Sequence, residues 1–290
     1  MNRAVLVLLL LLPGAVAAQS ELPCDYHDPK WLPNGERIAF YSNRAGDFDV
    51  YTIRADGSDL LNVTRHPARD SEFAWAPAGD RLVFKSNRDG QGAYYLASSD
   101  GTGVQPLSAD LGEVGAPRWT PDGRALVYEG RVGDNRDIFV VELEGLARRR
   151  VTSDTARDFR PAVSPDGRWL VFQSNRSGAY HLYRMSLTGG ESEALTVGPF
   201  NDASPTWSPD GSRLAFSSDR SGNEDIYVMT IGDTTVVQVT TDEALDYAPE
   251  WSPDGKSLVF ISSRSGRSGV YVVRLDGTPP RLLIEGCVAK

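Results

Sequence analysis

Two charged positions recur along this chain at a fixed spacing, and they are the first candidates for chemistry. The acidic position is occupied by Asp70, Asp158, Asp202 and Asp246, and the basic position by Arg44, Arg88, Arg176, Arg220 and Arg264. In the third of six similar units, Glu113 and Val114 stand where the aspartate would be. A collar of carboxylates and guanidinium groups has the chemistry to bind a cation or a basic peptide segment.

A structural role explains the same pattern. Each aspartate could be held by turn amides or by a nearby arginine that ties one unit to the next. A feature copied in nearly every unit favours a fold device, because a site on a pseudo-symmetric ring usually depends on what differs between units. The structural interpretation is therefore the stronger one, and the binding collar is kept as a hypothesis.

Several units depart from the pattern and are candidates for localising a partner or for sequence drift. The departures are Asp25-Tyr26 in the first unit, Glu113-Val114 and Arg131-Val132 in the third, and Val163 and His181 in the fourth. Since His27, His66 and His181 are the chain's three histidines and lie far apart in sequence, surface or packing roles are favoured for them.

The elements that must position these residues come from a unit of 44 residues repeated six times in register. The register residue is Trp31, Trp75, Trp119, Val163, Trp207 and Trp251, each followed by a variant of the turn Ser208-Pro209-Asp210-Gly211. This length, with short strands and Asp-Gly turns, is typical of a propeller blade. We expect an all-β, six-bladed β-propeller of four-stranded antiparallel blades, starting near residues 27, 71, 115, 159, 203 and 247.

The strands of one unit predict its place in the ring. The second strand is apolar at successive positions, as in Leu82-Val83-Phe84, so both of its faces should be covered by neighbouring blades. The first strand carries a proline in five of six units, which favours the edge that faces the central channel. Because each unit begins with this inner strand, we expect no strand exchange between the first and last blades.

The two ends of the chain predict export. Residues 1–18 contain Arg3, then an apolar run and a stretch of small residues, which is the layout of a secretory signal peptide. The remaining residues, 19–290, are expected to form a single propeller domain. Removing the signal takes away one arginine and no acid, so the net charge of -9 becomes -10. No later run is long and apolar enough to cross a membrane. We expect a soluble, periplasmic or secreted monomer that repels nucleic acid.

Two cysteines, Cys24 and Cys287, flank the six units. An isolated pair at opposite ends of a ring is well placed to form one disulfide in an oxidising compartment. Two free thiols are the alternative, which export disfavours. The sequence holds no motif for a catalytic serine, a zinc-binding histidine pair or a phosphate loop, so we expect no enzyme, no cofactor and no resident metal.

The amino-acid sequence of the repeats resembles that of a known family. Trp207 to Phe216, then Ser218-Asp219-Arg220-Ser221-Gly222 and Asp225-Ile226-Tyr227, is similar to the WD40-like PD40 repeat of TolB-type propellers, and the resemblance covers residues 25–286. It implies a non-catalytic periplasmic adaptor that docks a peptidoglycan-associated lipoprotein. Few residues precede Trp31 after the signal, so the α/β domain that such adaptors carry before the propeller is not expected here.

Three functions remain open. The leading hypothesis is an exported module that binds a protein or peptide in the cell envelope. The alternative is a propeller enzyme, such as a lyase acting on acidic sugars with a metal in the channel; the related serine peptidases would need a further hydrolase domain. A third possibility is a structural cation at the collar of charged residues.

Overall fold

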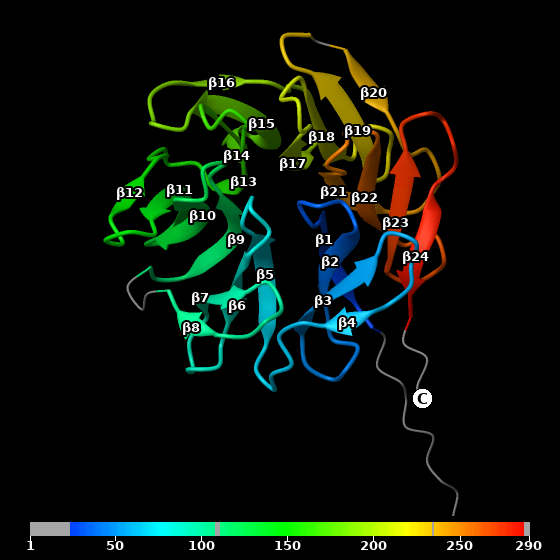
Figure 1. The fold of residues 1–290 in the computed structure, drawn as a ribbon. Helices are drawn as coiled ribbons and strands as arrows, with labels where there is room; N and C mark the ends of the chain where they lie inside the picture. Colours follow the sequence, from blue (N-terminus) through cyan, green and yellow to red (C-terminus); the bar gives the residue numbers. More distant parts are fainter. Residues whose placement is uncertain (1–23, 108–110, 234, 287–290) are drawn as a thin grey trace, which may run out of the picture.

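The computed structural model describes residues 24–107, 111–233 and 235–286, which form strands, turns and bends and no helix. Over these residues the chain folds into six four-stranded antiparallel sheets, numbered here as blades 1 to 6 in chain order. Figure 1 shows the sheets arranged around a central axis, with the first and last blades side by side. The predicted six-bladed propeller is confirmed.

Each blade uses its strands in chain order from the channel outward. The inner strands are β1 (Tyr26–Trp31), β5 (Asp70–Trp75), β9 (Val114–Trp119), β13 (Asp158–Val163), β17 (Asp202–Trp207) and β21 (Asp246–Trp251). The second strands are β2 (Arg37–Ser42), β6 (Arg81–Ser86), β10 (Ala125–Val132), β14 (Trp169–Ser177), β18 (Arg213–Ser218) and β22 (Ser257–Ser262).

The outer half of each blade consists of one long strand and one short one. The third strands are β3 (Asp49–Arg54), β7 (Ala93–Ser98), β11 (Asn135–Glu142), β15 (Ala179–Ser186), β19 (Asp225–Thr230) and β23 (Gly269–Arg274). The outer strands are β4 (Leu61–Asn62), β8 (Gln105–Pro106), β12 (Arg148–Arg150), β16 (Ser192–Ala194), β20 (Val236–Gln238) and β24 (Arg281–Glu285).

The hydrophobic core lies between blades. Leu82 and Phe84 of β6 pack toward Ala39 of blade 1, whereas Val83 packs on the other face with Leu126 of blade 3. All of these side chains are buried, so both faces of the second strand are covered as predicted. A single blade would leave these apolar faces in water. Stacking buries them between blades, which stabilises the fold by roughly 25 cal/mol per Å² of apolar surface removed from water.

The ring closes without strand exchange, because β1 to β4 form one sheet and β21 to β24 form another. At this closure β1 packs against β21 and β22, and one apolar cluster joins Ile38 and Phe40 to Val259 and Ile261. The predicted signal peptide and Cys287 lie outside the described residues. Cys24 is buried in the closing cluster, and its pairing with Cys287 stays a prediction.

Every inner strand contains a bulge at the same repeat position. The bulge residue has a positive φ, and the register to the second strand shifts beside it. The six residues are Asp28, Glu72, Ala116, Arg160, Ser204 and Ala248, with φ between 42° and 53°. Non-glycine residues rarely adopt this conformation, so its recurrence shows that the fold imposes it.

Candidate functional site

The predicted collar aspartates each occupy the first position of an inner strand, and their side chains are fully buried. Each pairs with the arginine that lies where the second strand turns into the third in its own blade; Arg176 is still part of β14. The pairs are Arg88–Asp70 at 3.0 Å, Arg176–Asp158 at 3.0 Å, Arg220–Asp202 at 2.6 Å and Arg264–Asp246 at 2.7 Å. These ion pairs therefore hold each inner strand to its own blade rather than to the next.

Aromatic rings complete the setting of each arginine. The guanidinium group of Arg88 lies 5.0 Å from the ring of Phe84 and 4.9 Å from that of Tyr95, and the arrangement recurs in blades 4, 5 and 6. Burial raises the pKa of Asp70, and Ser86 and Arg88 oppose this rise. A charge this buried needs its partner, so the collar is part of the blade interior. Its role in binding stays a prediction.

The blades that depart from the pattern use other contacts. Arg44 lies over Tyr51, and Tyr26, which replaces the aspartate in blade 1, donates its hydroxyl to the carbonyl of Gly286 at 2.9 Å. Glu113 is half exposed and pairs with Arg131 and Arg136. His181 is buried in blade 4, with Nδ1 3.5 Å from the carboxylate of Asp202 in blade 5. The contacts of Tyr26 and His181 thus connect blade 1 to blade 6 and blade 4 to blade 5.

Sequence reasoning missed a second set of charges, which belongs to the inner and second strands, the two strands of each blade nearest the central axis in Figure 1. Its members stand at the bulge of an inner strand, two residues after it, or on the second strand opposite. They are Asp28, Lys30, Glu72, Lys85, Arg118, Glu129, Arg160 and Glu250, which we call the channel cluster. Unlike the collar, the channel cluster differs from blade to blade.

Contacts within the channel cluster cross the ring. Arg160 of blade 4 places Nη1 3.8 Å from Oδ1 of Asp28 in blade 1, which is the opposite blade. Lys30 lies 2.8 Å from the same carboxylate and donates to the carbonyl of Phe73 in blade 2. Side chains of blades 1 and 4 and a backbone carbonyl of blade 2 therefore meet in this section of the channel.

Burial and mutual attraction shift the titration of the channel cluster. Burial alone would raise the pKa of Asp28, but Lys30, Arg118 and Arg160 together hold that pKa well below its usual range. Burial, together with the charge of Arg118, lowers the pKa of Lys30 to about 8. Burial raises the pKa of Glu250 despite Arg118 and Lys30. The cluster is therefore a balanced network in a dry environment.

Two carboxylates of the channel cluster converge on Gly115. A Cβ atom at Gly115 would lie 2.6 Å from Glu129 Oε1 and 2.9 Å from Glu72 Oε2, so a larger residue there would displace the two carboxylates. Glu72 accepts hydrogen bonds from the amide of Ala116 at 3.0 Å and from Lys85 at 3.4 Å. Burial raises the pKa of Glu129, which therefore takes up a proton at a higher pH than an exposed glutamate does.

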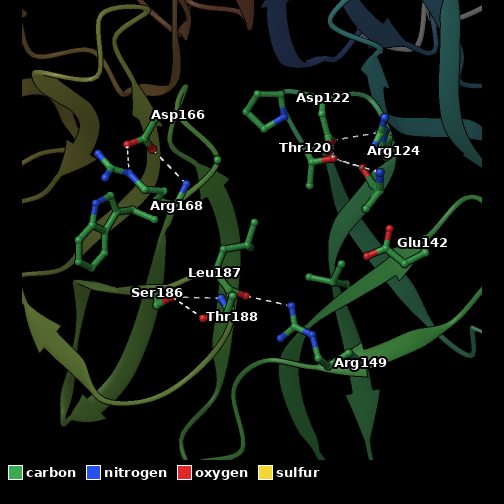
Figure 2. A pocket seen from close by; sticks show the side chains of 15 residues that line it. Thr120, Asp122, Arg124, Glu142, Arg149, Asp166, Arg168, Ser186, Leu187 and Thr188 are labelled. Atoms are coloured by element: carbon green, nitrogen blue, oxygen red, sulfur yellow. Dashed lines mark hydrogen bonds and ion pairs between the residues drawn. The ribbon is translucent and has the colours of Figure 1, made fainter.

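A groove of about 770 Å³ opens between blades 3 and 4, on the face that carries the turns after the inner strands (Figure 2). One wall comes from the turn Thr120–Arg124 with Glu142, and the other from the turn Asp166–Trp169 with Ser186 and Thr188. Arg149 of the outer strand β12 closes its outer end. We call this feature the blade 3–4 groove.

The blade 3–4 groove exists because two large side chains are missing there. Between blades 2 and 3, the guanidinium group of Arg81 lies 5.0 Å from the ring of Trp119, and between blades 5 and 6 Arg213 lies 4.5 Å from that of Trp251. At the same two repeat positions, the junction of blades 3 and 4 has Ala125 and Val163. Losing both the arginine and the tryptophan leaves the junction open.

Turn chemistry fixes most of the charges in the groove. Thr120 donates its hydroxyl to Asp122 at 2.6 Å, and Ser164 donates to Asp166 at 2.5 Å. Bonds from Ser164 and Arg168 lower the pKa of Asp166 to about 2. Arg149 donates to the carbonyl of Leu187 at 3.0 Å across the junction. The walls are thus preformed and present hydroxyl groups, charges and the half-exposed indole of Trp169.

Two further properties bear on function. Within the described ranges, no group of three or more His, Cys, Asp and Glu side chains is placed to hold a metal ion. Across the same residues, no helix is long and apolar enough to span a bilayer.

The sequence model of the TolB beta propeller domain family, PD40, matches residues 2–113, 107–205 and 197–286. Among curated proteins, none matches the chain.

Many solved structures share the fold. A TolB from Acinetobacter baumannii has a TM-score of 0.72 at 24% identity, over 88% of this chain and 61% of that one. A candidate TolB from Agrobacterium tumefaciens has a TM-score of 0.70 at 22% identity, over 86% and 90%. An oligogalacturonate lyase from Vibrio parahaemolyticus has a TM-score of 0.63 at 14% identity, over 91% and 79%. At these identities the likeness shows the fold alone.

Proposed function

Because the chain belongs to the TolB beta propeller domain family, we propose that it is an exported, non-catalytic module that binds a protein partner in the bacterial cell envelope. The family resemblance supports a periplasmic adaptor, and a peptidoglycan-associated lipoprotein is the partner class that it suggests. The signal-like residues 1–18 support export.

The blade 3–4 groove is the observation that carries this proposal. It is a preformed cleft that combines a half-exposed indole with polar groups at defined positions. Grooves of this kind suit a segment of a partner protein, because aromatic anchors supply contact area and polar groups fix the register. We therefore place the partner at this groove.

A capture experiment tests the proposal. The mature protein is immobilised and exposed to envelope extract, alongside the variant Ala125→Arg/Val163→Trp, which restores the two missing side chains and fills the groove. Ser257→Arg is the matched control, because Ser257 occupies the repeat position of Ala125 at another junction. We expect the wild type and the control to retain one envelope protein that the filled variant loses. Equal recovery by all three would refute the assignment.

Export has its own test. The protein secreted to the periplasm should have an intact mass that lacks residues 1–18. A mass that includes those residues in a cytoplasmic fraction would contradict export.

A further inference from the structure

The junctions of the propeller provide an internal comparison for what the blade 3–4 groove accepts. Arg81 donates to the carbonyl of Gly123 at 3.3 Å, and Arg213 donates to the carbonyl of Gly255 at 3.2 Å. In both cases the acceptor is the turn glycine of the next blade. The corresponding glycine beside the groove is Gly167, and Ala125 offers it no guanidinium group.

We propose that the blade 3–4 groove binds an arginine side chain of the partner protein, which occupies the space that Arg81 and Arg213 fill at their junctions. This inference rests on the proposed function, because it names the chemistry of the partner at that site. The incoming guanidinium group donates to the carbonyl of Gly167 and lies between the two turn walls.

Glu142 provides the matching charge. Figure 2 shows its side chain reaching from the blade 3 wall toward the open centre of the groove. Among the described residues, no side chain donates a hydrogen bond to its carboxylate. The same repeat position in the other blades holds Arg54, Ser98, Ser186, Thr230 and Arg274, so the acid is particular to this junction.

The other charges of the groove are already engaged or screened. Asp122 and Asp166 accept hydrogen bonds within their own turns, and Arg168 pairs with Asp166 at 2.7 Å. Arg149 donates to a backbone carbonyl. Arg124 is exposed, as Glu142 is, so solvent and salt screen the two charges alike. Glu142 is therefore the carboxylate that remains for an incoming cation.

Arginine fits this site better than lysine does. A guanidinium group is a planar fork with five donors, so it can serve the Gly167 carbonyl and the Glu142 carboxylate together. A lysine ammonium group is a compact point charge and reaches one acceptor well. Selectivity for arginine over lysine is thus a property of the proposed site.

Nuclear magnetic resonance can measure this selectivity. The probe is the blocked peptide acetyl-Gly-Arg-Gly-amide, titrated into the ¹⁵N-labelled mature protein while the amide of Gly167 and the indole of Trp169 are followed. The matched probes carry lysine, or citrulline, which keeps the shape of arginine without its charge. We expect the arginine probe to bind at least tenfold more tightly than either. Equal affinities for arginine and citrulline would overturn the proposal.

Variants locate the site. Ala125→Arg should abolish the shifts of Gly167, Glu142→Gln should weaken binding at least fivefold, and Ser257→Arg should leave it unchanged. Unaltered binding by Ala125→Arg or Glu142→Gln would contradict the proposal. If Ala125→Arg does not fold, Glu142→Gln decides the matter, because this exposed substitution leaves the blade interior intact.

The two proposals fail in different ways. Groove-dependent capture of an envelope protein without arginine selectivity would overturn the arginine inference and leave the adaptor function standing. Capture that does not depend on the groove would overturn the groove as the binding site and the arginine inference with it. Failure to capture any envelope protein would overturn the function itself, whatever the peptides show.

Discussion

Blades 5 and 6 are joined by an arginine and a tryptophan that blades 3 and 4 both lack. At the first junction Arg213 lies over Trp251 and bonds to Gly255, whereas at the second Ala125 and Val163 leave a groove of about 770 Å³. The hydrophobic cluster between blades 3 and 4 is nevertheless continuous. The apolar interior thus holds a junction together, and the polar clamp above it can be given up for a binding surface.

The largest effect is expected at the junction between blades 6 and 1, where the predicted disulfide would add a covalent link to the blade packing. We expect Cys24→Ser to lower the free energy of unfolding by about 4 kcal/mol, because the predicted bond to Cys287 would restrict the unfolded chain over almost its whole length. Thermal unfolding of wild type and variant, with and without reductant, measures this. A melting temperature that neither change alters would show that blade packing alone closes the ring.

Breaking a collar pair comes next in size. Arg220→Ala leaves the fully buried Asp202 without its guanidinium partner, so we expect a loss of about 3 kcal/mol in unfolding free energy. The control is Arg168→Ala, whose pair with Asp166 is largely exposed and is worth at most about 1 kcal/mol. Denaturant unfolding compares the two. Similar effects would show that the collar is not a buried structural device.

The clamp itself should contribute less. We expect Arg213→Ala to lower the unfolding free energy by about 1 kcal/mol, since it removes one stacking contact and one hydrogen bond at an exposed edge. It should also remove the arginine from the junction of blades 5 and 6 while Trp251 stays in place, as a crystal structure of the variant would show. A loss of several kcal/mol would mean that open junctions need compensation elsewhere.

The smallest effect concerns the channel cluster and depends on pH. The raised pKa of Glu129 means that the folded state holds its proton more tightly than the unfolded state does. Stability from this group is therefore full below the ordinary glutamate pKa and falls as pH rises through the folded value. We expect Glu129→Gln to raise the melting temperature at pH 8 and to change it little at pH 4.

Exposed Glu191→Gln is the control for this pH dependence, because it removes a glutamate charge without touching the channel cluster. The control should shift the melting temperature equally at both pH values. A pH-independent effect of Glu129→Gln would contradict the buried, proton-holding environment of this carboxyl.

The sequence predicts the parts of this molecule that are written six times. Three features recur in most repeats: the tryptophan register, the second strand with two apolar faces and the inner-strand prolines. Because they recur, their structural roles can be inferred from the sequence alone. The collar pairs belong to this group too, since Asp70 and Arg88 have counterparts in other blades. What the sequence does not show is that these charges are buried against each other.

The remaining features depend on residues that occur once and meet only in space. Arg160 and Asp28 come from opposite blades, and no spacing rule pairs them. A signal did exist at the bulge positions, where three of the six residues, Asp28, Glu72 and Arg160, are charged. The blade 3–4 groove had a signal as well, because Ala125 and Val163 depart together from the repeat. Val163 visibly breaks the tryptophan register, but the second departure, Ala125, lies in another blade.

The bulge in every inner strand has a consequence for how such a protein can change. Its backbone shape is set by the strand on either side, and aspartate, glutamate, alanine, arginine and serine all adopt it. The side chain at this position can therefore be replaced while the backbone of the inner strand and of the propeller around it keeps its conformation. In related propellers, the polarity of the central channel can thus change through single substitutions at these bulge positions.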